Sequence, residues 1–156
     1  MIARSMRTDD IDGLLNMLAL QHQDGGVGIE RANLEQALCI LFRQPELGAV
    51  FVLDEGGTLI GGAVVTTGFS LDLGGRAVVV NALCVGSPYR EQGNRRLLID
   101  RILAFARRSD CRAIVLEPGR DDHDSCCWYD DLGFEHRHRE YCLASVTALS
   151  LRLAVA

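Results

Sequence analysis

The stretch from Ala77 to Leu116 constrains the fold more than any other part of the chain. Its first part, Ala77–Val85, is almost continuously apolar and predicts a buried strand, which Gly86-Ser87-Pro88 ends. From Gly93 to about Arg108 apolar residues recur at helical spacing, and Ala113–Leu116 then predicts a second strand. A strand, a helix and a strand in this order indicate two parallel strands joined by a crossover helix.

The segments before and after this unit predict a mixed sheet with helices on its faces. Before it, we expect a strand at Ile2–Met6, helices beginning near Ile11 and Glu30, and a hairpin of Val50–Leu53 with Leu59–Thr67. After it, we expect a short helix at Asp121–Leu132, which Gly133 ends, and strands at Phe134–Glu140 and Val146–Val155. Hairpins in the first half indicate antiparallel pairing, and the crossover adds one parallel pair.

Length and composition place residues 1–156 in a single domain. The 156 residues are 48% hydrophobic, which is enough for a packed core. The formal net charge of −5 argues against a protein that binds nucleic acid by neutralising phosphates. No apolar run approaches the roughly 18 residues of a membrane span, and the polar start Met1–Asp10 is unlike a secretory signal. We therefore expect a cytoplasmic protein that does not bind membranes.

Six cysteines fit the same expectation. Without a signal peptide, they are better interpreted as reduced thiols than as disulfides. Histidines and cysteines gather between His123 and Cys142, which raises a structural zinc site as an alternative. Their spacing lacks a pair of cysteines separated by two residues, so we expect no metal.

The loop before the predicted helix combines a glycine with a high density of arginines. Arg90, Arg95 and Arg96 flank Gly93 where the helix begins, in a chain that is acidic overall. The first turn of a helix leaves about four backbone N–H groups without intrahelical acceptors, and the helix dipole favours an anion there. The pattern matches neither a Walker loop nor the dinucleotide-binding GxGxxG. It predicts a phosphate or pyrophosphate site; the alternative is a solvated helix start.

Two motifs, in this order, resemble the GCN5-related N-acetyltransferase (GNAT) family. The first is the family's acetyl-CoA loop, (Q/R)-x-x-G-x-(G/A), which is here Arg90-Glu91-Gln92-Gly93-Asn94-Arg95. The second is an aromatic-Tyr-x-x-Leu-Gly-Phe segment, here Trp128–Phe134. The resemblance covers essentially the whole chain. It implies an α/β (α+β) fold with a mixed, mostly antiparallel sheet of about six to seven strands, flanked by about four helices and splayed between the fourth and fifth strands.

The resemblance also implies which residues hold acetyl-CoA. The family binds the acetyl carbonyl and the pantetheine through backbone groups at the splayed strand end, here Leu83, Cys84 and Val85. The implied loop residues for the pyrophosphate are Arg90, Glu91, Gln92, Gly93, Asn94, Arg95 and Arg96. Arg95 departs from the family's usual glycine or alanine, so its side chain must point away or narrow the pocket. Asp122 stands where relatives often have an asparagine on the pantetheine arm, and it lacks the amide donor.

Acetyl transfer to an amine requires that the amine lose a proton and that the departing thiolate gain one. A lysine-like amine has a pKa of about 10.4, so a base must help to deprotonate it. The resemblance implies that Tyr129 is the acid that protonates the thiolate. Glu117 is the candidate base, directly or through a water; the alternative is a glutamate in solvent at a strand end. Asp121 and His123 are further candidates, and Asn81 could only orient the substrate or a water.

These residues together predict an acetyl-CoA-dependent N-acetyltransferase that acts on a primary amine of a small molecule or a peptide N-terminus. We expect direct attack in a ternary complex, and no acyl intermediate on Cys84, because direct transfer is the family norm. One alternative is a non-catalytic acyl-CoA-binding sensor or scaffold, which Arg95 favours; another is an acyltransferase for a longer acyl group or an oxygen acceptor. Alternating apolar residues in Val146–Val155 fit either a homodimer interface or a half-buried strand of a monomer.

Overall fold

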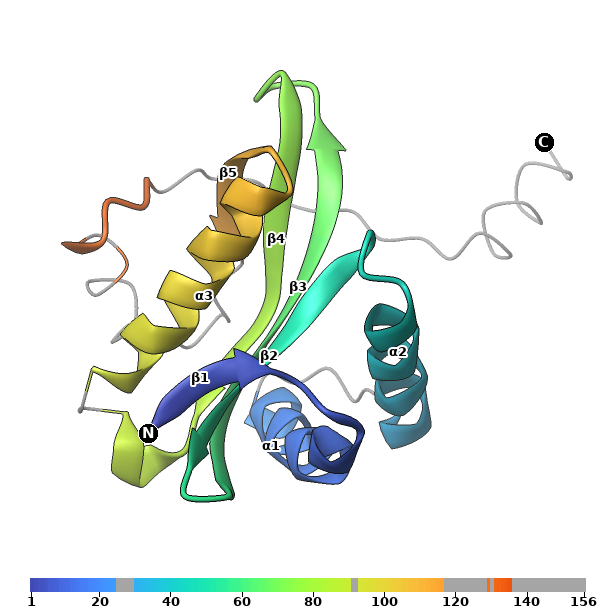
Figure 1. Ribbon diagram of the computed structural model, residues 1–156, viewed down its shortest axis with the longest axis vertical. Helices are drawn as coiled ribbons and strands as arrows, with labels where there is room; N and C mark the ends of the chain where they lie inside the picture. The colour runs from blue at the N-terminus through green and yellow to red at the C-terminus, as the bar shows by residue number, and fades with distance from the viewer. Residues whose placement is uncertain (25–29, 91–92, 117–128, 130, 136–156) are drawn as a thin grey trace, which may run out of the picture. The chain divides into compact units, whose positions relative to one another are not determined.

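The computed structural model describes residues 1–24, 30–90, 93–116, 129 and 131–135 (Figure 1). The chain divides into two compact units, Met1–Asp121 and Asp122–Ala156. The first unit contains the described sheet and helices. In the second unit, the described residues are Tyr129 and residues 131–135. That the whole chain forms a single domain stays a prediction.

Five strands of the first unit form one mixed sheet, in the order in which they occur along the chain. They are β1 (Ile2–Ser5), β2 (Gly48–Glu55), β3 (Thr58–Ser70), β4 (Gly75–Val85) and β5 (Cys111–Leu116). β1 to β4 pair antiparallel with their neighbours, whereas β4 and β5 are parallel. Helix α3 (Asn94–Arg108) connects this parallel pair, so the predicted crossover is confirmed. Two 3₁₀ helices, η1 (Thr8–Asp10) and η2 (Ser87–Tyr89), precede α1 and α3.

The β2–β3 hairpin is longer than its sequence pattern predicted. Gly56 and Gly57 form a two-residue turn with φ angles of 60° and 92°, which glycine adopts without steric strain. Pairing therefore continues up to Glu55 and Thr58, the residues on either side of the turn. Asp54 and Glu55, which lie beyond the predicted strand Val50–Leu53, therefore belong to β2.

Helices α1 (Ile11–Asp24) and α2 (Arg31–Arg43) pack together on one face of the sheet (Figure 1). Their apolar side chains meet alternate strand residues, which share a face because successive side chains point to opposite sides. The buried cluster contains Met6, Leu14, Leu15, Leu18, Leu38, Val50, Val52, Val64 and Ala82. Gly62 of β3 permits this close approach, because a Cβ there would collide with Cδ1 of the fully buried Leu14.

Helix α3 covers the opposite face of the sheet. Its Phe105 packs edge to face on Phe51 of β2, with ring centroids 6.1 Å apart. Phe51 alternates with strand neighbours that face α1 and α2, so it points to the other side. The predicted apolar stripe of α3 is buried at Leu98 and Ile102, but Leu103 is 36% exposed. Residue 103 follows Ile102 by about 100° around the helix, which turns its side chain away from the sheet.

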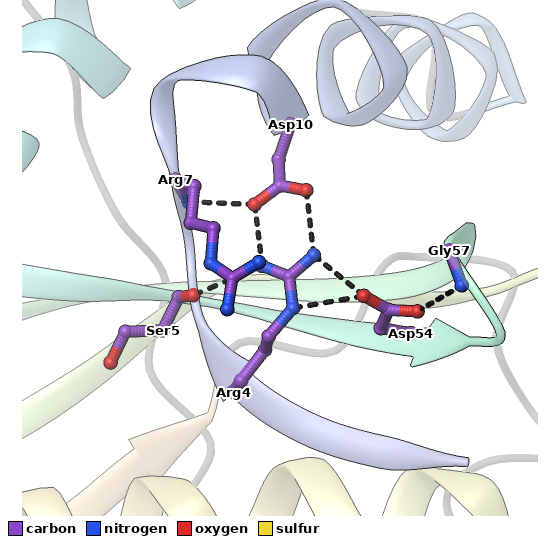
Figure 2. Close-up of polar contacts among 6 residues, drawn as sticks. All are labelled: Arg4, Ser5, Arg7, Asp10, Asp54 and Gly57. Carbon is purple, nitrogen blue, oxygen red and sulfur yellow. Dashed lines mark hydrogen bonds and ion pairs between the residues drawn. The ribbon is translucent and has the colours of Figure 1, made fainter.

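A charged cluster ties the edge strand β1 to the rest of the unit (Figure 2). Arg4 lies between the carboxylates of Asp10 and Asp54 and donates hydrogen bonds to both. Backbone N–H groups of Arg7 and Gly57 donate to the same two carboxylates, at 2.6 and 2.8 Å. The side chains of Arg4, Asp10 and Asp54 are 15% exposed or less, so these charges would be costly to bury without partners.

The fold class expected from the resemblance is confirmed, with different element counts. The described residues contain five strands and three α-helices, whereas about six to seven strands and four helices were expected. The predicted helix at Asp121–Leu132 and the two predicted C-terminal strands lie largely outside the described residues. The proposed dimer interface therefore lies outside them as well.

Three of the six cysteines lie within the described ranges. Cys39, Cys84 and Cys111 are free thiols, and the remaining cysteines lie outside these ranges. Of the helices in the described part of the chain, none has the length and apolar character needed to cross a membrane.

Candidate active site

The register of β4 changes at Asn81. Val65 of β3 pairs with Val80 and Val64 pairs with Ala82, so Asn81 is an extra residue, a β-bulge in β4. The described pairing of β4 with β5 reaches Val80, which lies opposite Leu116, the last described residue of β5. From Asn81 to Val85, β4 therefore continues beyond the described ladder with β5. The splay between the fourth and fifth strands, which the resemblance implied, would lie past Leu116 and so outside the described residues.

The continuation of β4 contains the residues expected to bind the acetyl and pantetheine groups through their backbone. Leu83 and Cys84 are half-buried and Val85 is buried, and all three pair with β3. In an antiparallel ladder, backbone groups point alternately toward and away from the neighbouring strand. Some N–H and C=O groups of this segment therefore face away from β3.

The Cys84 side chain points toward α1 and α2. Its side chain packs against the buried cluster, and its thiol donates to the Gly62 carbonyl at 3.5 Å. Burial raises the pKa of the Cys84 thiol to about 11. A thiol with this pKa is protonated at neutral pH and is a poor nucleophile. The geometry thus supports the expectation that Cys84 carries no acyl group.

The turn after β4 is fixed by hydrogen bonds on both sides. The Gly86 N–H donates to the Ile60 carbonyl at 2.9 Å, which extends the contact of the turn with β3. Nε of Arg90 donates to the Val85 carbonyl at 3.0 Å. Arg90, which was expected to act on the cofactor, therefore also holds the last carbonyl of β4. That carbonyl retains a second lone pair for another donor.

The start of α3 is fastened to this turn through Asn94. Gly93 caps the helix with φ of 70°, in the left-handed region, and the Arg96 N–H donates to its carbonyl at 3.0 Å. The buried Asn94 side chain donates from Nδ2 to the Tyr89 carbonyl at 2.8 Å. Because this amide is used within the fold, Asn94 would meet a cofactor through its backbone.

The first turn of α3 carries positive charge and no acidic residue. Arg96 is exposed and pairs with Asp100, one turn further along, at 3.0 Å, so its guanidinium lies along the helix. Arg95 is half-buried. The positive end of the helix dipole repels both arginines, which costs up to about 1 kcal/mol of free energy for each one. A bound anion would offset that cost. This helix start is suited to a phosphate group.

In the second unit, the aromatic motif forms a helix end around Gly133. The Phe134 N–H donates to the Tyr129 carbonyl at 3.1 Å, and Gly133 adopts φ of 86°. This is the Schellman arrangement, in which the residue after the glycine folds back on the last helical turn. Accordingly, the ring of Phe134 packs edge to face on the buried Tyr129 at 5.8 Å. The motif thus fixes the Tyr129 ring locally, and the predicted end at Gly133 is confirmed.

Several predicted site residues lie outside the described ranges. They are Glu91, Gln92, Glu117 and Asp122, together with the further base candidates Asp121 and His123. Within the first unit, the structure brings the β4 end, Leu83–Val85, together with Arg90 and the start of α3. The role of each of these residues stays a prediction.

Sequence reasoning missed Thr66, a residue of β3 beside the bulge. Its hydroxyl donates to Oδ1 of Asn81 at 2.9 Å. Asn81 is the one polar residue of the run Ala77–Val85, but the run does not indicate which residue of β3 lies beside it, so the pairing of these two side chains could not be predicted. For a metal, the described residues offer no group of three or more His, Cys, Asp or Glu side chains.

Comparison with solved structures agrees with this fold. Among solved structures, an integron cassette protein from the mobile metagenome of Cole Harbour Salt Marsh is similar at 23% identity and a TM-score of 0.77, over 92% of this chain and 90% of that one. A "predicted acetyltransferase with acetyl-CoA" from Clostridium acetobutylicum is 17% identical, with a TM-score of 0.75, over 91% and 94%. These likenesses establish the fold.

A third similar structure is the aminoglycoside antibiotic 6'-N-acetyltransferase of Acinetobacter haemolyticus. It is 14% identical, with a TM-score of 0.75, over 93% of this chain and 98% of that one. No curated protein gives a significant match. The profile of the acetyltransferase (GNAT) family matches residues 14–134, well over half of the chain. The chain therefore belongs to the acetyltransferase (GNAT) family and is an acyltransferase of the N-acetyltransferase type.

Proposed function

We propose that this enzyme transfers an acetyl group from acetyl-CoA to a primary amine of a small molecule or a peptide N-terminus. The observation that carries the proposal is the end of β4. This strand continues from Asn81 to Val85 beyond its described pairing with β5. The arginine-rich start of α3 is joined to the segment after β4 by the hydrogen bond from Asn94 to the Tyr89 carbonyl. Backbone donors and a positive helix start in one place suit a thioester arm and its pyrophosphate.

The proposed reaction is one direct displacement within a ternary complex. The amine nitrogen attacks the thioester carbonyl, a C–N bond forms, and the C–S bond of acetyl-CoA breaks. The amine proton passes to Glu117 or to a water that it holds, and Tyr129 gives its phenolic proton to the departing thiolate. The high pKa of Cys84 supports this route over one with an acyl-enzyme, because its thiol stays protonated.

The chemistry of the cofactor assigns the remaining roles. Gly93, Asn94 and Arg95 would hold the pyrophosphate through the backbone N–H groups of the first turn of α3, together with Glu91 and Gln92. Arg90 and Arg96 add positive charge beside it, and Asp122 would touch the pantetheine arm.

The free cysteines of the described residues fit a cytoplasmic location, where thiols stay reduced.

Calorimetry and thiol release together test this proposal. Acetyl-CoA is titrated into the protein, and CoA release is then followed with a panel of primary amines. We expect binding, and turnover with at least one class of amine. Binding without turnover of any amine would support a sensor and overturn the proposed transfer.

Two variants test the catalytic residues. Tyr129→Phe keeps the ring and its contact with Phe134, and it should lower turnover about 100-fold while acetyl-CoA affinity stays nearly the same. Glu117→Gln should lower turnover most at low pH, because a smaller fraction of the amine substrate is neutral there and a base is needed more. Glu135→Gln, which changes an exposed glutamate in the same way, is the matched control. Equal turnover of wild type and Tyr129→Phe would remove the acid assignment.

A further inference from the structure

Asn81 lies on the face of the sheet that carries α1 and α2, at the margin of that helix pair. Its partner Thr66 is two residues along β3 from Val64, which belongs to the cluster beneath the helices. Residues two apart in a strand share a face. The bulge places Asn81 and Ala82 on this face in succession: Ala82 is buried beneath the helices, whereas Asn81 is exposed.

The orientation of the Asn81 amide is set by Thr66. The Thr66 hydroxyl donates to Oδ1, so this oxygen is already engaged at 2.9 Å. An asparagine amide has two donor hydrogens on its nitrogen. Within the described part of the chain, Nδ2 of Asn81 contacts no hydrogen-bond acceptor, and the side chain is exposed. The pair therefore presents a donor to whatever approaches this face.

The position along β4 connects this donor to the reaction. Asn81 is the first residue beyond the described ladder with β5, two residues before Leu83. Two strand residues span about 7 Å, which is the length of a small amine with a few carbon atoms. A molecule held near the acetyl end of the cofactor would therefore reach the Asn81 amide.

We propose that Asn81, oriented by Thr66, is a specificity-determining residue that donates a hydrogen bond to an oxygen of the acceptor amine. This inference rests on the proposed function and adds a substrate class to it: primary amines with an ether, hydroxyl, carbonyl or carboxylate oxygen a few atoms from the nitrogen. A primary amine whose carbon chain has no oxygen atom would leave the Asn81 amide without a hydrogen-bond acceptor once water is excluded.

A matched pair of amines tests the proposal on the intact enzyme. The probes are 2-methoxyethylamine and n-butylamine, which have the same length but differ in one ether oxygen. The readout is the kcat/KM for 2-methoxyethylamine divided by the kcat/KM for n-butylamine, with acetyl-CoA as the acetyl donor. Asn81→Ala should lower this ratio about tenfold, which is the loss of one hydrogen bond, and leave the KM for acetyl-CoA unchanged. Asn81→Asp keeps the acceptor for Thr66 but loses the donor, so it should lower the ratio too.

Two threonines provide the positioning variant and its control. Thr66→Val frees the Asn81 amide to rotate and should lower the ratio by a smaller factor. Thr67→Val removes hydrogen bonds on the opposite face of the same strand, to the Glu46 carbonyl at 2.8 Å and from Arg76 at 3.5 Å, and should leave the ratio unchanged. An equal ratio in wild type and Asn81→Ala, with turnover preserved, would overturn this inference alone. Absence of turnover of every amine by the wild type would overturn it together with the proposed function.

Discussion

The guanidinium of Arg4 grips the carboxylate of Asp10 with two parallel hydrogen bonds, one to each oxygen, at 2.6 and 2.9 Å (Figure 2). The same guanidinium donates to Asp54 from Nε and a terminal nitrogen, at 3.0 and 2.8 Å. One side chain of the edge strand thus satisfies carboxylates from two other segments of the unit. Planar, two-pronged contacts of this kind are stronger than hydrogen bonds between neutral groups.

Removal of Arg4 should destabilise the protein strongly. Arg4→Met keeps the aliphatic stem but leaves two carboxylates, each 15% exposed or less, without their cation. We expect urea denaturation to show a lower free energy of unfolding, because Asp10 and Asp54 lose the cation that they share. Arg31→Met is the control, because the Arg31–Asp12 pair is exposed and should cost less than about 1 kcal/mol. Similar losses in the two variants would contradict this account.

The same cluster should make stability depend on pH in acid. Hydrogen bonds from Arg4 hold the pKa values of Asp10 and Asp54 below their ordinary value of 3.8. Carboxylates with a depressed folded-state pKa stabilise the fold above the unfolded pKa, and this contribution is lost as pH falls through the folded values. The difference in unfolding free energy between wild type and Arg4→Met should thus be constant from pH 8 to 5 and shrink below about pH 4. A constant difference down to pH 2 would refute the linkage.

Gly62 should be required for the contact between α1 and β3. Gly62→Ala places a methyl group against Cδ1 of Leu14, which is fully buried and cannot move aside freely. We expect a loss of about 1–3 kcal/mol in the free energy of unfolding, from overpacking. Gly68→Ala, in the same strand but with open space around it, should change stability little. Thermal unfolding followed by circular dichroism compares the two, and equal melting temperatures would show that the helix adjusts.

Cys84 should react slowly with alkylating reagents in the folded protein. Its pKa of about 11 leaves roughly one thiolate in a thousand at pH 8. Iodoacetamide labelling, followed by peptide mass spectrometry, should therefore be far slower for folded than for urea-unfolded protein. The rate in the folded state should rise about tenfold per pH unit up to the pKa. Fast labelling at pH 7, or an acetylated Cys84 after incubation with acetyl-CoA, would reopen the acyl-enzyme route.

Periodicity and turn chemistry predicted most of the first unit. The apolar run Ala77–Val85 could be assigned because it is buried on both faces, and the α3 stripe because its spacing is helical. In the second unit, Gly133 marked a helix end because the left-handed residue after a helix is usually glycine. These signals are local, and local patterns determine where elements begin and end.

The features that shape the candidate site arise from pairing between segments, so the sequence did not reveal them. The bulge at Asn81 depends on how β4 aligns with β3, and a single polar residue within an apolar run does not reveal that alignment. Thr66 became relevant only through that alignment. Likewise, nothing near Arg90 in the sequence indicates that its side chain binds the Val85 carbonyl.

Gly93 should matter for cofactor binding beyond its effect on stability, and Gly56 allows the two to be separated. Both adopt a left-handed φ, 70° and 60°, and a Cβ would meet nothing within 4 Å at either position. Alanine at each should therefore cost a similar 1–2 kcal/mol or so of backbone strain. Gly93→Ala, however, disturbs the helix start proposed to hold the pyrophosphate, whereas Gly56 lies in the β2–β3 turn. We expect acetyl-CoA affinity, measured by calorimetry, to fall about tenfold for Gly93→Ala and to stay unchanged for Gly56→Ala. Equal affinities at equal stability loss would mean that the pyrophosphate is held elsewhere.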